Sequence, residues 1–332
     1  SGFRGKMRRS IFAGWFFLMA LGACGSSQDS SFGNNGGGDG GNGSDASAGG
    51  GFNGGGGGGA GDCPAEAKNY VYVISAERAL YRFAPDQKKF DKVGDLRCTN
   101  STRSMPNSMA IDRSGQAWVN YITLDGSGAV VGGAIYRVSV LDASCDVGSM
   151  FALPKAWMRI GMGYSTDSST AKTETLFIAS TSGTSHNLGR LDVATKAVAP
   201  LGSFVPQNPF ASLNAELTGT GDARLYGMFI QVSAGANRPS PIVGLIDKSS
   251  ASAESPVDMS GVEAPNAWAF SFWGGHFYLY TSPWHDPTRT SNVTDFDPVS
   301  GNIDASYMGN VGFNIVGAGV STCAPTTPPP IH

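Results

Sequence analysis

Two acidic residues and one arginine are the side chains whose placement could support hydrolysis. Asp112 ends one apolar segment, Glu216 lies within another, and Arg159 directly precedes a third that begins near Gly161. Glycoside hydrolysis needs two carboxyl groups on facing elements. These residues therefore suit catalysis or ligand binding only if the fold brings the three segments together.

The histidines offer no further catalytic arrangement. His186, His276, His285 and His332 show no metal-ligand spacing with one another or with a carboxylate. A proline-flanked surface loop explains the neighbouring His285 and Asp286 better than acid–base chemistry does. No Gly-x-Ser-x-Gly turn stands between a strand and a helix. We therefore expect no metal and no cofactor.

Four cysteines follow residue 60, namely Cys63, Cys98, Cys145 and Cys323. An even number in an exported chain favours disulfides. A Cys₄ metal site is the alternative, but the chain has no CxxC pair, which such sites usually contain.

A basic and apolar leader indicates export. Arg8 and Arg9 precede the apolar run 11–21, which is too short for a permanent transmembrane helix and suits a secretory signal peptide. The run ends in Leu21-Gly22-Ala23-Cys24, which resembles the lipobox of bacterial lipoproteins. That resemblance implies cleavage before Cys24 and attachment of lipid, including palmitate, to this residue. An ordinary signal peptide with an unmodified cysteine is the alternative.

Composition then divides the chain into four parts. Residues 1–23 are the predicted lipoprotein signal peptide, and 24–62 combine the lipidated cysteine with a Gly-rich tether. The tether cannot bury enough apolar surface to order itself, and it would span roughly 35 Å. Residues 63–324 are the folded domain, and 325–332 form a Pro-rich tail predicted to be disordered.

Strand-and-turn patterns recur within the folded domain. Short runs rich in Val, Ile, Phe, Tyr and Trp alternate with Gly, Asp, Ser and Pro, which is typical of strands and turns. Similar units begin near residues 108, 161, 215 and 268, and each predicts four antiparallel strands. Four strands per unit with a period near fifty residues is typical of a β-propeller blade.

The two ends of this region predict a fifth, composite blade. Residues 70–96 match strands two to four of a blade, and residues 314–320 match a first strand. Pairing them closes the ring and removes exposed sheet edges. Closure would also place Cys63 beside Cys323, so we expect a Cys63–Cys323 disulfide and, by elimination, Cys98–Cys145. The fold class is therefore an all-β, five-bladed β-propeller, with a six-bladed ring and a β-sandwich as alternatives.

First strands line the central channel of a propeller, so Asp112, Arg159 and Glu216 could face one another there. Aromatic residues enter several first strands and could form a binding face or pack between blades. These aromatic residues are Trp157, Phe210, Trp268 and Phe313.

The whole pattern resembles bacterial surface lipoproteins that carry a β-propeller after a Gly/Ser-rich tether. No WD, Kelch or quinoprotein motif is present, so the resemblance assigns no active-site residue. The net charge of −3 shows no footprint for nucleic acid. We expect a monomeric, non-enzymatic binding module of the cell envelope, anchored to the outer membrane by lipid, with an envelope protein or a glycan as partner. A carbohydrate-active hydrolase or lyase with acids in the channel is the alternative.

Overall fold

The computed structural model describes residues 63–180, 187–204, 214–231, 239–263, 265–283 and 288–329. The predicted leader, the lipobox cysteine Cys24, the tether and Phe210 lie outside these ranges, as do His186, His285 and His332. Within the described part, no helix has the length and apolar character to cross a membrane.

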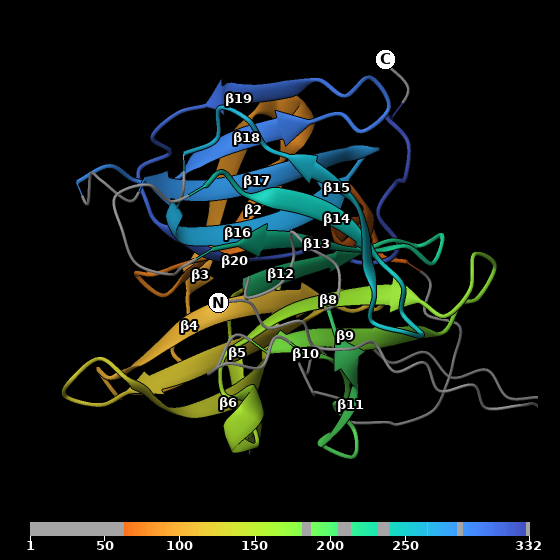
Figure 1. The fold of residues 1–332 in the computed structure, drawn as a ribbon. Coiled ribbons are helices and arrows are strands. Elements are labelled where there is room, and N and C mark those ends of the chain that lie inside the picture. Colours follow the sequence, from red (N-terminus) through yellow and green to blue (C-terminus); the bar gives the residue numbers. More distant parts are fainter. Residues whose placement is uncertain are drawn as a thin grey trace, which may run out of the picture. The chain divides into compact units, whose positions relative to one another are not determined.

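Twenty strands form five four-stranded antiparallel sheets in the described ranges, which we number as blades (Figure 1). Blade 1 contains β20 (Ile315–Gly319), β1 (Val71–Ser75), β2 (Ala79–Ala84) and β3 (Lys89–Asp95), in that order. Blade 2 contains β4 (Ser104–Ile111), β5 (Gln116–Leu124), β6 (Val130–Ser139) and β7 (Cys145–Ala152). Blade 3 contains β8 (Ile160–Thr166), β9 (Glu174–Ser180), β10 (Asn187–Asp192) and β11 (Ala197–Ser203).

Blade 4 contains β12 (Asn214–Gly219), β13 (Leu225–Ile230), β14 (Ile242–Ile246) and β15 (Ala253–Asp258). Blade 5 contains β16 (Pro265–Trp273), β17 (His276–Pro283), β18 (Asn292–Phe296) and β19 (Ile303–Met308). The helices are short: α1 (Ala65–Asn69), η1 (Pro85–Gln87) and η2 (Lys155–Trp157). The predicted five-bladed propeller is therefore confirmed, and the six-bladed and sandwich alternatives are excluded.

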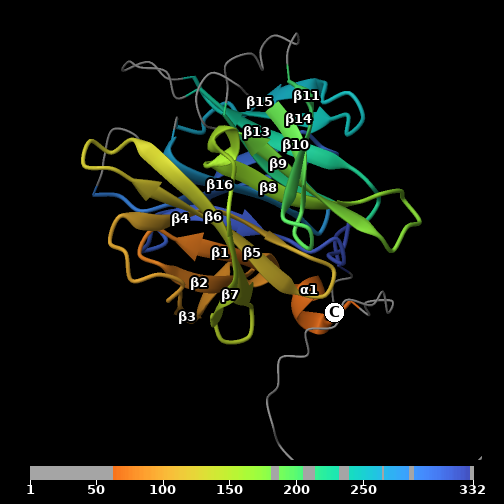
Figure 2. The same cartoon turned by 90° about the horizontal axis from the view of Figure 1, so that it is seen from below.

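The ring closes through the composite blade. Strand β20 pairs antiparallel with β1, with Val73 opposite Ala318 and Tyr72 opposite Gly319. The inner strands β20, β4, β8, β12 and β16 contact one another in that cyclic order, and β16 returns to β20. The C-terminal part of the domain thus supplies the first strand of a sheet whose other three strands come from its N-terminal part. Figure 2 shows these three strands, β1, β2 and β3, side by side.

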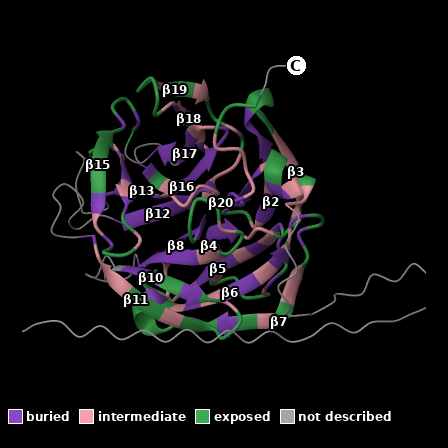
Figure 3. Ribbon diagram, turned by 90° about the vertical axis from the view of Figure 1, so that its right-hand side faces the viewer, coloured by how far each residue is buried: buried purple, intermediate pink, exposed green. Residues whose placement is uncertain are grey.

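The core lies between the blades. Each pair of neighbouring blades encloses its own apolar cluster, such as Ile135, Met162 and Ile178 between blades 2 and 3. Inner strands such as β8 and β12 are buried along their whole length, whereas the outermost β15 is almost wholly exposed (Figure 3).

Five inner strands crowd around a narrow axis, which requires small residues there. A Cβ on Gly161 would lie 2.2 Å from the Ala215 carbonyl oxygen, and one on Gly219 would lie 2.1 Å from that of Tyr164. Because both obstacles are backbone atoms, neither can move aside without shifting a strand. The glycines let blades 3 and 4 approach closely enough to complete the ring.

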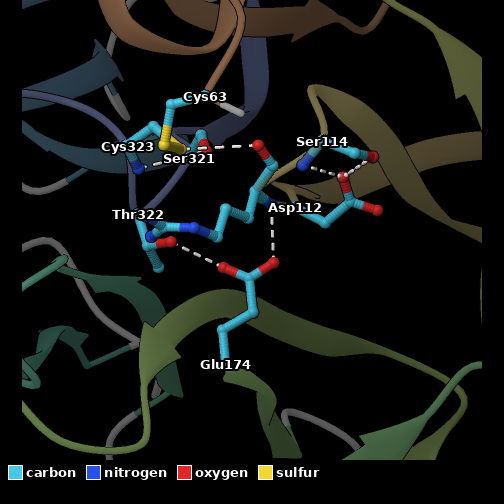
Figure 4. The surroundings of a disulfide bond; sticks show 8 residues. Cys63, Asp112, Ser114, Glu174, Ser321, Thr322 and Cys323 are labelled. Carbon is cyan, nitrogen blue, oxygen red and sulfur yellow. Dashed lines mark hydrogen bonds between the residues drawn. A yellow bond between two sulfur atoms is a disulfide. The ribbon is translucent and has the colours of Figure 1, made fainter. Parts of the chain in front are cut away.

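Two disulfides are present, one at the ring closure and one at the outer edge of the propeller. Cys63, just before α1, bonds to Cys323, just after β20 (Figure 4). Cys98 follows β3 and bonds to Cys145 at the start of β7, which links blades 1 and 2 at their outer strands. Both pairings match the sequence prediction.

Candidate binding pocket at the propeller axis

A small pocket opens at the end of the axis where the inner strands begin. Its volume is about 110 Å³, and residues from all five blades line it. They include Asn107 from blade 2, Arg159 before blade 3, Glu216 from blade 4, Trp268 from blade 5 and Val316 from blade 1. We call this cavity the axial pocket.

Arg159 is held in the axial pocket by a buried amide network. Its Nε donates to Asn107 Oδ1 at 2.9 Å, and its guanidinium carbon lies 5.8 Å from the centre of the Trp268 ring. Asn107 Nδ2 in turn donates to Asn120 Oδ1 at 3.0 Å and to the Ile160 carbonyl at 2.9 Å. The pairing of β4 with β5 shifts register between Pro106 and Ser108, a bulge of the kind that redirects a side chain.

Burial favours the neutral form of Glu216. Only 4 % of its surface is exposed, and burial raises the pKa of its carboxyl group well above the ordinary value. Ser108 Oγ donates to Glu216 Oε2 at 2.8 Å, and this bond, with the charge of Arg159, offsets only part of the desolvation. Arg159 is also desolvated, which lowers its pKa, but a guanidinium keeps its charge in proteins.

The axial pocket can therefore recognise a small polar group. It combines one cation, an amide, a neutral carboxyl group and an indole ring face, so both charge and hydrogen bonding are available. A volume of about 110 Å³ equals that of only three or four water molecules in the liquid. Such a cavity admits an end group rather than a whole ligand.

Asp112 is not part of the axial pocket, contrary to the prediction that it could face Glu216. Its Oδ1 accepts hydrogen bonds from Ser114 N at 3.0 Å, Ser114 Oγ at 2.6 Å and Gln116 N at 2.9 Å. Asp112 thus stabilises the β4–β5 turn at the far end of β4, roughly 13 Å along the strand from Ser108. The two acids line different pockets, so they cannot flank one glycosidic bond.

The described members of the predicted aromatic face pack between blades. Trp157 is buried beside Ile160 and Leu191, and Phe313 stacks on Tyr81 with ring centres 3.9 Å apart. Trp268 alone of these borders the axial pocket. The structure therefore brings Arg159, Glu216 and Trp268 together and places Trp157 and Phe313 in the core.

No sequence prediction included Asn107, Asn120 and Ser108, which hold the polar side chains of the axial pocket in place. Asn107 and Ser108 occupy the first half of β4, and Asn120 lies on the neighbouring β5. All three are buried polar residues within apolar strands, which is a signal that the sequence does contain. Polar residues in predicted inner strands indicate the axis more directly than acids alone.

His276 has a structural role. Its Nδ1 lies 2.8 Å from Asp295 Oδ1, across the β17–β18 pairing, and burial raises the pKa of Asp295. Among the described residues, no three potential metal ligands of the His, Cys, Asp and Glu types gather at one place.

A second and larger pocket lies at the opposite end of blades 2 and 3. Its volume is about 620 Å³, and it is lined by Asp112, Arg113, Lys172, Glu174 and Arg190, among others. We call it the blade 2–3 pocket. No sequence pattern predicted this pocket.

Comparison with known proteins gives likeness of fold alone. No family model matches the chain, and no curated protein sequence matches it. TolB from Acinetobacter baumannii is similar at 16 % identity and a TM-score of 0.40, covering 73 % of this chain and 53 % of that one. The chain thus spans about half the length of TolB.

Two further solved structures are enzymes. A luciferin-regenerating enzyme shares 12 % identity at a TM-score of 0.45, covering 77 % of this chain and 92 % of that one. An exo-β-1,3-galactanase from Phanerochaete chrysosporium shares 11 % identity at a TM-score of 0.49, covering 71 % and 59 %. Propellers host unrelated functions, so these likenesses assign no activity.

Proposed function

We propose that this protein is a non-enzymatic binding module of the bacterial cell envelope, held at the outer membrane by lipid on Cys24. The propeller presents its axial pocket to an envelope protein or a glycan, and the pocket receives a polar end group of that partner. The lipobox-like run before Cys24 and the Gly-rich tract after it support the anchoring. The two disulfides agree with an oxidising compartment.

The composition of the axial pocket is the observation that favours binding over hydrolysis. Glu216 is the only carboxyl group among the described residues that line it, and burial raises its pKa. Hydrolysis of a glycoside by the usual route needs a second carboxyl group within about 10 Å. A fixed cation, an amide and an indole face instead suit recognition by hydrogen bonds and stacking.

Affinity capture tests this proposal. The full-length wild-type protein is compared with Arg159→Ala and Arg159→Lys in envelope extracts from the producing bacterium. Lysine keeps the charge but loses the geometry that reaches Asn107. Arg224→Ala is the matched control because Arg224 also lies over aromatic rings, those of Tyr226 and Phe272, in the β12–β13 turn.

We expect the wild type and Arg224→Ala to retain the same partner and both Arg159 variants to lose it, with melting temperatures that show folded protein. Retention of the partner by both Arg159 variants would remove the axial pocket from the proposal. Turnover on a panel of glycosides, esters and phosphates, abolished by Glu216→Gln, would replace binding by catalysis.

A further inference from the structure

The blade 2–3 pocket is a built cavity that the proposed axial binding does not use. Its volume of about 620 Å³ lies within the range of small-molecule sites. Three elements form it: the β4–β5 turn, the β8–β9 hairpin and β10 with the residues after it. Leu176, Leu191 and Tyr164 are buried and give the pocket an apolar floor.

The acids of this pocket are occupied by the protein itself. Asp112 accepts hydrogen bonds from its own turn, and Asp192 Oδ1 accepts from Ala194 N at 2.9 Å and Thr195 N at 3.0 Å. Glu174 Oε1 accepts from Arg113 N at 2.5 Å, and Glu174 Oε2 accepts from Thr322 Oγ1 at 2.6 Å (Figure 4). Glu174 thereby ties blades 2 and 3 to the segment that carries Cys323.

The cations of the pocket, unlike its acids, are available to a ligand. Lys172 and Arg190 are exposed side chains, and neither belongs to an ion pair among the described residues. Arg113 adds a third cation from the β4–β5 turn, and its buried Nε has no hydrogen-bond partner within the described ranges. Three basic groups from three elements therefore surround one cavity.

We propose that the blade 2–3 pocket binds an anionic sugar, whose carboxylate or phosphate pairs with Lys172 and Arg190 while its ring lies on Leu176 and Leu191. The hydroxyl groups of Ser114 and Thr175 border the same cavity. They donate their hydrogens to Asp112 and Asp167, so their oxygens can accept hydrogen bonds from the hydroxyl groups of a sugar. A neutral sugar would leave the cations unpaired and bind more weakly.

Glu174 makes this binding dependent on pH. Burial raises the pKa of Glu174 to about 7, with a smaller contribution from the charge of Asp112, while Arg113 and Thr322 act in the opposite direction. Lys172, Arg190, Asp192 and Tyr164 also face the cavity from the surrounding elements. Below pH 7 the carboxyl group is neutral and does not repel an anion, whereas above pH 7 it does.

Calorimetric titration of the full chain tests the proposal with three probes: glucuronate, glucose 6-phosphate and uncharged glucose. We expect at least one anionic probe to bind and glucose to bind at least ten-fold more weakly. Carboxylate and phosphate recognition are separated by which anionic probe binds. Lys172→Glu and Arg190→Glu should each weaken binding by about ten-fold, because each reversal changes the local charge by two.

Lys155→Glu is the matched control, since Lys155 is an exposed lysine of η2 at the other end of blade 3. It should bind as the wild type does, and so should Arg159→Ala, which separates this site from the axial pocket. Absence of binding by both anionic probes at millimolar concentration, equal binding of glucose, or binding unchanged in both reversal variants would overturn the proposal.

The pH arm uses Glu174→Gln. The charge of a phosphate probe also changes between pH 6 and pH 8, so the wild-type affinity is compared with that of the variant at each pH. The ratio of wild-type to variant affinity should fall on the order of five-fold from pH 6 to pH 8, as expected for one added charge nearby in a solvated site. A ratio that does not change with pH would show that Glu174 does not control binding.

Discussion

Closing the ring by a disulfide should stabilise the protein more than joining its outer strands does. Cys63 and Cys323 are separated by 260 residues, and Cys98 and Cys145 by 47. In the chain-entropy model these loops give about 5.5 and about 4 kcal/mol, a difference of about 1.5 kcal/mol. The difference arises in the unfolded chain, because the longer link removes more of its freedom.

Two single-disulfide proteins isolate these values. The variant Cys98→Ala with Cys145→Ala keeps only the closing link, and Cys63→Ala with Cys323→Ala keeps only the outer one. Each is unfolded in urea with its remaining disulfide oxidised and then reduced, so that side-chain volume does not change within a comparison. The decrease in the free energy of unfolding on reduction is the contribution of that disulfide.

We expect reduction to lower the free energy of unfolding by about 1.5 kcal/mol more in the protein that keeps Cys63–Cys323 than in the one that keeps Cys98–Cys145. Hydrogen exchange should also accelerate in β20 only when the closing link is reduced, because β20 lies next to Cys323. Equal losses, or a larger loss for the Cys98–Cys145 link, would refute the reasoning from loop length.

Four further outcomes follow from the structure. Gly161→Ala should destabilise the fold by about 3 kcal/mol in urea unfolding, because its Cβ would strike the Ala215 carbonyl, whereas Gly126→Ala, with no atom within 4 Å, should change little. Glu216→Gln mimics the protonated acid and should lower the free energy of unfolding by less than about 1 kcal/mol at pH 5. Glu216→Ala should lower it by about 2–3 kcal/mol, because it leaves a cavity and an unpaired Ser108 hydroxyl group. The pKa of Glu174 is raised from 4.5 to about 7 on folding, so between these pH values the folded state binds a proton that the unfolded state does not. The contribution of Glu174 to the free energy of unfolding is therefore lost as the pH rises through this window. Relative to Glu174→Gln, the wild type should therefore lose on the order of 3 kcal/mol between pH 4.5 and pH 7, and parallel pH curves would contradict this. Cys24→Ala should abolish incorporation of labelled palmitate and release the protein from the membrane fraction, and a variant that stays membrane-bound would exclude the lipid anchor.

The five-bladed architecture could be predicted from two independent features of the sequence. One is the repeated strand pattern, and the other is the incomplete set of strands at each end of the folded domain. Predicted first strands near 108, 161, 215 and 268 correspond to β4, β8, β12 and β16, which begin at 104, 160, 214 and 265. Strand β4 extends further toward its N-terminal end because Ser104, Met105 and Pro106 still pair with β5. The missing strands at the two ends of the region specified the composite blade, and the cysteines agreed with it.

The role of Asp112 was harder to predict, although the chain contains a warning. Asp112 begins an Asp-Arg-Ser-Gly turn, and Asp125, Asp142 and Asp297 begin similar turns between strands. In these turns the carboxylate accepts a backbone N–H two residues later. An acid that belongs to a recurring turn pattern is therefore a poor candidate for catalysis.

The blade 2–3 pocket could not be predicted because its residues are far apart in the sequence and individually ordinary. Glu174 opens a β-strand, and nothing local distinguishes it from any surface glutamate. Its Oε2 accepts a hydrogen bond from Thr322 Oγ1, which is 148 residues away in the sequence. Long-range packing, rather than local pattern, creates the altered pKa.

Photo-crosslinking in living cells tests binding at the axis most directly. A photoreactive amino acid replaces Asn266, an exposed residue at the axial pocket, or Val299, which is 93 % exposed in the β18–β19 turn of the same blade. We predict one discrete crosslinked product from position 266, lost when Arg159→Ala is added, and none from position 299. The same product from both positions, or none from position 266, would contradict binding at the axis.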